Sequence, residues 1–151
     1  MEKSASSSVS KTRLTFARIL IAAVLFFNLQ CAALFILHGE RYAPSFELQG
    51  EPGAALIRGL GLLFLMWNIP YMFALWHPLR KRVSLIEACL MQAIGVVGET
   101  LLLFSLPAGH AAIVASTTRF IYFDASGLVG LLIAFFLTRP GNNQTNTAQT
   151  I

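Results

Sequence analysis

Charged side chains are scarce in this sequence. They make up 12% of its 151 residues, whereas hydrophobic residues make up 56%. A soluble domain carries roughly 25% charged residues, so this chain lacks the polar side chains to cover a surface in water. A lipid bilayer removes that deficit, because lipid solvates the outside of an apolar bundle. Four spans of roughly 20 residues and two tails use up the chain, so no soluble catalytic domain is expected.

Cysteine and histidine are also few, and neither is arranged for metal or redox chemistry. Cys31 and Cys89 lie within apolar runs and form no C-x-x-C motif, so disulfide, zinc and thiol-exchange roles have little support. We interpret both as small buried hydrophobic residues. His38, His77 and His110 fall at the ends of apolar runs, whereas a membrane haem needs facing histidines within them. No cofactor and no metal site are therefore expected.

Signatures of catalysis are missing as well. The sequence has neither G-x-S-x-G nor H-E-x-x-H, and it has no glycine-rich loop between a strand and a helix. No nucleophile with a neighbouring base is visible. The sequence therefore names no catalytic residue and favours a protein without enzymatic activity.

Four apolar runs are each long enough to cross a membrane, which takes about 20 residues of helix. The first run continues through Cys31 to Leu37, beyond the roughly 7–15 apolar residues of a signal peptide, so we interpret it as a membrane anchor. The sequence predicts an all-α integral membrane four-helix bundle, arranged up-down-up-down, over residues 14–139. The predicted spans are about 14–38, 54–76, 83–106 and 113–138, between disordered tails at 1–13 and 140–151.

Basic residues gather on one side of these spans. With both termini inside the cell, the cytoplasmic side holds Lys3, Lys11, Arg13, Arg18, Arg80, Lys81, Arg82 and Arg139, and the outer side holds Arg41, Arg58 and Arg119. Cytoplasmic loops carry an excess of Lys and Arg, so we predict an N-in, C-in protein of the bacterial inner (plasma) membrane. The net charge of +4 then reflects topology, and no nucleic-acid partner is expected. The outer connection at 38–53 is rich in Gly and Pro, which makes helix unlikely there.

Polar residues within the predicted spans form one layer in the outer half of the membrane. They are Arg58, Glu99, Arg119 and Asp124, with the amides Asn28 and Gln30. Ionisable groups in spans are costly and tend to face the bundle or a cavity. One interpretation is structural: Glu99 pairs with Arg119 or Arg58, and Asp124 takes the remaining base. The other is a polar cavity, open to the outside, that binds a small ligand or passes a proton.

The third span has a polar face, and the second has a predicted kink. Ala88, Gln92, Gly95, Glu99 and Leu102 recur at spacings of three and four, which predicts one inward face. Pro70 lacks a backbone N–H, so the second span should kink near it, with Asn68 available to satisfy a freed carbonyl. The segment with Trp67, Asn68, Pro70 and Tyr71 is either an aromatic-lined kink or the floor of the outer cavity.

A short stretch of the second span resembles a known family. Residues 55–65, ALIRGLGLLFL, are similar to the Arg-then-Gly-rich helix of DoxX-like small four-helix bacterial membrane proteins. In that family such a helix comes first, whereas here it comes second. The resemblance implies a four-helix bundle that acts as an accessory component. Small multidrug exporters also have four spans, but they need a central Glu in the first, where this chain has Asn28 and Gln30.

Two functions remain open at this stage. The first is a non-enzymatic accessory or scaffold component that holds a small ligand or lipid in the polar layer, beside a membrane protein partner or a second copy. The second is a small proton-coupled transporter that uses Glu99 or Asp124. A compact, paired polar layer would favour the first, and an open cavity with an unpaired carboxylate would favour the second.

Overall fold

The computed structural model describes residues 9–139, and within that range its regular structure is entirely helical. Four helices are long and apolar enough to cross a membrane: Lys11–Leu37, Gly50–Trp76, Arg82–Ser105 and Ala111–Leu137. The chain is therefore an all-α, multi-pass membrane protein, as the sequence predicted. Of the predicted tails, residues 1–8 and 140–151 lie outside the described residues. Residues 11–13, predicted to be disordered, belong to the first helix, which begins at Lys11.

Six α-helices and one 3-10 helix make up the described chain. They are α1 (Lys11–Leu37), α2 (Gly39–Tyr42), η1 (Ala43–Phe46), α3 (Gly50–Trp67), α4 (Ile69–Trp76), α5 (Arg82–Ser105) and α6 (Ala111–Leu137). The second span consists of α3 and α4, which meet at Asn68. Helices α1, α5 and α6 each form a span of their own.

The connection between α1 and α3 is folded, which corrects the prediction that helix is unlikely at 38–53. It contains α2 and η1. Pro44 lies in the first turn of η1, where its missing N–H removes no helical hydrogen bond. Glu47 ends η1 in the left-handed conformation, with φ 58°. Pro44 is thus compatible with the first turn of a short helix that the sequence pattern made unlikely.

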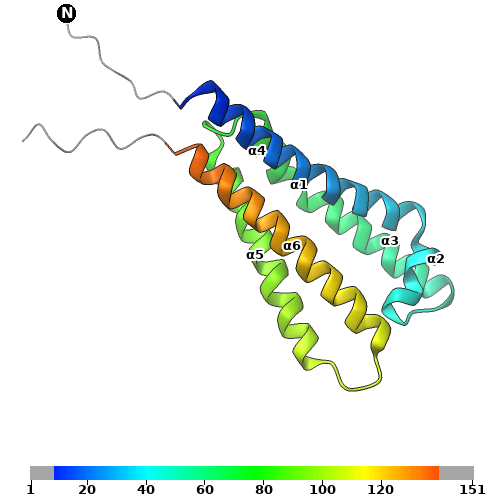
Figure 1. Ribbon diagram of the computed structural model, residues 1–151. Coiled ribbons are helices and arrows are strands. Elements are labelled where there is room, and N and C mark those ends of the chain that lie inside the picture. The colour runs from blue at the N-terminus through cyan, green and yellow to red at the C-terminus, as the bar shows by residue number, and fades with distance from the viewer. Residues whose placement is uncertain (1–8, 140–151) are drawn as a thin grey trace, which may run out of the picture.

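The bundle is tighter at one end than at the other. Figure 1 shows the start of α1 and the end of α6 at one end, which we call the terminal end, and the connections after α1 and α5 at the other, the connection end. Helix α1 packs on α3 and α6, and α5 packs on α6. Helix α4 packs on α5 and α1, but α3 makes little contact with α5. The second and third spans therefore meet near the terminal end and diverge toward the connection end.

Small residues form much of the buried core. The cluster toward the terminal end consists of Ala17, Ile21, Leu25, Tyr71, Ala74, Leu85, Ala88, Leu131 and Ala134. A second cluster, under the connection after α1, consists of Phe35, Ala43 and Ile57. Alanine and glycine let membrane helices approach closely, because packing rather than hydrophobicity drives their association. Gly61 is one such position: a Cβ there would lie 2.9 Å from the backbone oxygen of Ala32 on α1.

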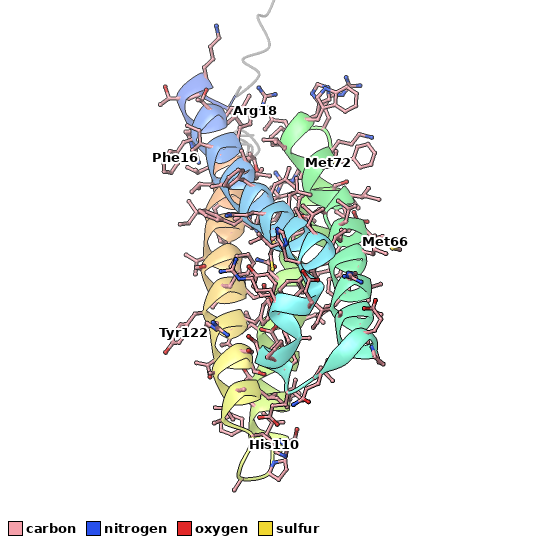
Figure 2. The ribbon with its side chains drawn as sticks, turned by 90° about the vertical axis from the view of Figure 1, so that its right-hand side faces the viewer. Phe16, Arg18, Met66, Met72, His110 and Tyr122 are labelled. Carbon is pink, nitrogen blue, oxygen red and sulfur yellow. The ribbon has the colours of Figure 1, made fainter. Side chains whose placement is uncertain are left out.

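Large apolar side chains cover the outside of the bundle. Phe104 is 83% exposed and Ile94 is 70% exposed. Figure 2 shows Phe16, Met66 and Met72 on the periphery of the helices. A soluble monomer rarely exposes so much contiguous apolar surface. The bilayer covers this surface, so lipid is a direct contact of the four spans.

The predicted kink is present between α3 and α4. The N–H of Asn68 bonds to the carbonyl of Leu65, 3.2 Å away, which leaves the carbonyl of Phe64 without its usual donor. The Asn68 side chain takes that place, because its Nδ2 donates to the Phe64 oxygen at 2.6 Å. Pro70 follows in the first turn of α4. The break turns α4 toward α5 and leaves α3 on α1.

Candidate functional site

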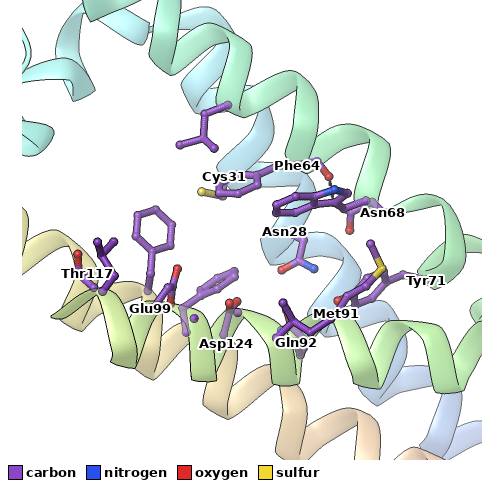
Figure 3. A pocket seen from close by; sticks show the side chains of 18 of the residues that line it. Asn28, Cys31, Phe64, Asn68, Tyr71, Met91, Gln92, Glu99, Thr117 and Asp124 are labelled. Carbon is purple, nitrogen blue, oxygen red and sulfur yellow. Dashed lines mark hydrogen bonds between the residues drawn. The ribbon is translucent and has the colours of Figure 1, made fainter. Parts of the chain in front are cut away.

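A cavity of about 550 Å³ occupies the space where α3 and α5 diverge. Residues of α1, η1, α3, α4, α5 and α6 line it (Figure 3). Several lining residues are also exposed at its edge, and they come from α3 and α5: Trp67, Ile94, Gly98 and Leu102. The mouth of the cavity therefore lies between these two helices and faces the lipid side of the bundle.

The walls of the cavity are largely apolar, and aromatic rings form a substantial part of them. The ring-bearing lining residues are Phe46, Phe64, Trp67, Tyr71, Phe120 and Phe123. Three of them form a cluster near the connection end: the ring centroids of Phe46 and Phe120 are 6.2 Å apart, and those of Phe64 and Phe120 are 6.1 Å apart. Sequence reasoning missed most of these residues. The chain has 12 phenylalanines, and the sequence alone does not distinguish a ring that faces the cavity from one that faces lipid.

Two carboxyl groups enter the cavity from neighbouring helices. Glu99 projects from α5, and Asp124 projects from α6. The Asp124 carboxylate lies against Gly95, where a Cβ would overlap it. One oxygen of Glu99, Oε2, is buried and has no hydrogen-bond partner within residues 9–139. The polar face predicted for α5 is thus directed inward: Ala88 and Gln92 are buried, and Gly95, Glu99 and Leu102 line the cavity.

The expected ion pairs across the polar layer are not formed in the described chain. Arg58 instead pairs with Glu40 and Glu51, at 3.1 and 3.0 Å, on the exposed surface of the connection end. Arg119 is exposed and donates to the hydroxyl of Ser116 at 3.1 Å. The folded connection explains the difference, because α2 places an acid beside Arg58 that an irregular loop would not have fixed there.

The pKa of Glu40 reflects this arrangement. It lies below its ordinary value, first because the carboxylate accepts the residue's own backbone N–H and then because Arg58 donates to it. The base predicted to neutralise the cavity is therefore engaged elsewhere. Across the described ranges, no Lys, Arg or His lines the cavity.

The two amide side chains predicted to lie together on α1 face different sides of the helix. Asn28 lines the cavity, but Gln30 is exposed on the outside of the bundle. Residues two apart on a helix point in nearly opposite directions, so both could not face inward. A third amide, Gln92 of α5, is 5% exposed and lines the cavity. Its Nε2 lies against Gly127 of α6, without a hydrogen-bond partner among the described residues.

Residues of the kink line the cavity, from its exposed edge at Trp67 to the buried side chains of Asn68 and Tyr71. Trp67, Asn68 and Tyr71 line it, whereas Pro70 does not. The hydroxyl of Tyr71 donates to the backbone oxygen of Ala88 at 3.2 Å, which ties α4 to α5. Asn68 is 2% exposed, and its Oδ1 has no partner in the part of the chain that the structure describes. Three of the four residues predicted at this kink thus lie at the cavity.

The connection after α1 covers the cavity at the connection end. Phe46 of η1 lines it, and two contacts hold this segment to α6 and its preceding turn. Ser116 donates to the backbone oxygen of Ser45 at 2.7 Å, and His110 Nδ1 lies 2.6 Å from Glu47 Oε2. The hydrogen bond with His110 holds the pKa of Glu47 below its ordinary value. We call residues 43–48 the cover segment.

The described residues contain no group of three or more His, Cys, Asp or Glu side chains that could hold a metal ion. Cys31 lines the cavity as a lone thiol.

Comparison with known proteins identifies no relative. No family model, no curated protein and no solved structure matches the chain. The structure shares with the DoxX-like proteins the general plan of a small four-span membrane protein.

Proposed function

We propose that this protein is a non-enzymatic component of a bacterial inner membrane that holds a small amphiphilic molecule in the cavity between α3 and α5. The observation that carries the proposal is a cavity with largely apolar walls that opens toward the lipid between α3 and α5 and contains Glu99 and Asp124. Acidic groups inside membrane spans are expensive to keep, so they usually mark a functional site.

The shape of the cavity supports binding from the lipid phase. Its volume of about 550 Å³ falls within the roughly 300–1,000 Å³ typical of small-molecule sites. The core cluster that includes Tyr71 and Ala88 packs the bundle toward the terminal end. The cover segment lies over the connection end. The exposed edge between α3 and α5 remains, and a molecule soluble in lipid would enter there.

The orientation of the bundle is part of the proposal. The basic turn after α4 lies at the terminal end together with the start of α1, which favours that end in the cytoplasm. A phosphatase active only outside the cytoplasm, fused after Arg139, should be inactive, and fused within residues 106–110 it should be active. The reverse pattern would refute the N-in, C-in orientation.

Proton-coupled transport is the second candidate function, and one observation favours it. An open cavity with unpaired carboxyl groups is the arrangement expected of a transporter, and in residues 9–139 neither Glu99 nor Asp124 forms an ion pair. Uptake into proteoliposomes under an imposed pH gradient distinguishes the two functions. A holding protein binds its ligand without net uptake, and a transporter accumulates it in a way that Glu99→Gln abolishes.

Binding can be followed through a tryptophan in the cavity. The chain has two tryptophans, Trp67 at the cavity and Trp76 at the end of α4. In a Trp76→Phe background, phenylbutanol or phenylbutylammonium should change the fluorescence of Trp67 saturably. Both probes carry an aromatic ring that suits the cavity walls and a polar end that suits the carboxyl groups.

Two glycines offer a matched pair of variants for this experiment. A Cβ at Gly98 or at Gly59 meets nothing within 4 Å, so a side chain has open space to begin at both sites. Gly98 lines the cavity and Gly59 does not. Gly98→Phe should abolish the saturable signal, and Gly59→Phe should leave it unchanged. If neither probe binds the parent protein, or if both glycine variants behave alike, the proposed cavity function is wrong.

A further inference from the structure

We infer that the cavity selects a lipophilic cation, which Glu99 and Asp124 hold by charge while the aromatic walls hold its apolar part. This inference rests on the proposed function, since it names the chemical class of the ligand for the same cavity. It draws on four features of the lining: its charge, its free acceptors, its rings and the arrangement of the two carboxyl groups.

Among residues 9–139, the charged side chains that line the cavity are all acidic. The titratable side chains that face the cavity are Glu99 of α5, Asp124 of α6, Cys31 of α1 and Tyr71 of α4. None of them becomes positive on titration. Arg58 is paired outside the cavity, as described above. An anionic ligand would therefore meet two acids and no counter-charge, whereas a cation would meet the charge that it needs.

A buried acceptor on the opposite wall points to the same class of ligand. Figure 3 shows Asn68 and Phe64 across the cavity from Glu99 and Asp124. The bond from Asn68 Nδ2 to the Phe64 oxygen sets the orientation of the amide, so Oδ1 is the atom that has no partner among the described residues. Leaving a buried acceptor unpaired is costly. A ligand that carries N–H donors, such as an ammonium, can satisfy Oδ1 directly or through a water.

The aromatic cluster suits a cation as well as an apolar group. Phe46, Phe64 and Phe120 come from three different elements and enclose the connection end of the cavity. The face of an aromatic ring attracts a cation within about 6 Å of its centroid, and more strongly where water is excluded. The same rings offer the apolar surface that a hydrocarbon tail requires.

Binding of a cation here should be coupled to release of a proton. An ionised carboxylate without counter-charge is costly inside a membrane, and two neighbouring carboxyl groups disfavour double ionisation. One monocation replaces one proton: the O–H bond of one carboxyl breaks, the proton goes to the solvent, and the ammonium pairs with the carboxylate that remains. The net charge of the site is unchanged, and no other reactant is consumed.

The test compares three probes of nearly equal size: phenylbutylammonium, phenylbutanol and phenylbutyrate. Binding to purified Trp76→Phe protein in nanodiscs is followed by Trp67 fluorescence, and proton release is followed with a pH dye in weak buffer. We expect the dissociation constant of the cation to be at least about tenfold lower than that of the alcohol. A tenfold difference corresponds to about 1.4 kcal/mol of binding free energy. About one proton should be released per cation bound and none per alcohol, as the balance above requires.

Isosteric variants assign the effect to the carboxyl groups. Glu99→Gln, Asp124→Asn and the double variant keep the size of the side chains, and circular dichroism confirms that each has folded. The double variant should bind cation and alcohol with affinities within about twofold of each other. It should release no proton, because its cavity has no carboxyl group left.

The outcomes separate the two proposals. If phenylbutanol or phenylbutyrate binds the parent protein as tightly as phenylbutylammonium, and Gly98→Phe blocks that binding, the cavity holds a ligand but cation selectivity is refuted. The same holds if the cation keeps its advantage in the double variant. If no probe binds in a way that Gly98→Phe blocks, the proposed function fails together with the inference.

Discussion

Replacing Gly61 with alanine tests the close contact that holds α3 on α1 and away from α5. An added Cβ would lie 2.9 Å from both the oxygen of Ala32 and the nitrogen of Ile36. Ordinary contact begins near 3.4 Å, so the overlap is about half an ångström. Because the opposing atoms belong to the α1 backbone, no side-chain rotation relieves it, and the helices must separate. Such overpacking typically costs about 1–3 kcal/mol.

The matched control lies two residues away on the same helix. Gly59→Ala adds the same methyl group where nothing lies within 4 Å. Both variants gain roughly the same helix propensity, about 1 kcal/mol relative to glycine. The free energies of unfolding of the two variants should therefore differ by the steric cost alone. At roughly 2–4 °C per kcal/mol for a chain of this size, Gly61→Ala should melt about 2–12 °C below Gly59→Ala.

Thermal unfolding in mild detergent, followed by circular dichroism, measures this difference. Equal melting temperatures for Gly61→Ala and Gly59→Ala would refute the close packing of α3 on α1. Equal values would also contradict the inference that this packing keeps α3 apart from α5 and the cavity open.

Two further predictions concern the polar residues. Glu99→Gln and Arg119→Ala should change the free energy of unfolding independently, so their effects should add within about 0.5 kcal/mol in a double-mutant cycle. If the two residues formed a buried ion pair, each single variant would instead lose on the order of 3–5 kcal/mol, and the double variant would recover part of that loss. Because the pKa of Glu47 is lowered in the folded protein, its contact with His110 stabilises the fold at pH values above the ordinary pKa of a carboxyl group. This stabilisation is lost as the pH falls through the pKa of Glu47 in the folded protein. The melting temperature should therefore drop less in Glu47→Gln than in the parent protein on acidification below about pH 5; equal drops would show that the contact contributes nothing.

Several local features were predictable because they depend on neighbours along the chain. Pro70 predicts the kink from its missing N–H alone, and the structure breaks the helix beside it. The inward face of α5 follows from the spacing of Gln92, Gly95 and Glu99, because helical periodicity places them together whatever the neighbour is.

The partners of the charged residues were not predictable in this way. Arg58 and Glu99 lie at similar depth on neighbouring spans, which made a pair plausible. The structure pairs Arg58 with Glu51 of the same helix and with Glu40, which the folded connection places beside the first half of α3. Depth along a helix can be counted from the sequence, but direction around the bundle depends on which helices pack together.

By itself, the sequence determined the number of membrane spans, the absence of a surface suited to water, and the position of the kink. These follow from apolar run length and backbone chemistry, which act locally. Only the tertiary structure decided that α3 leans on α1, that the cover segment folds over the connection end, and that Glu99 and Asp124 share a cavity without a basic partner in the described chain. Each of these depends on helix-to-helix packing, which joins residues distant in sequence through close fits such as Gly61 against Ala32.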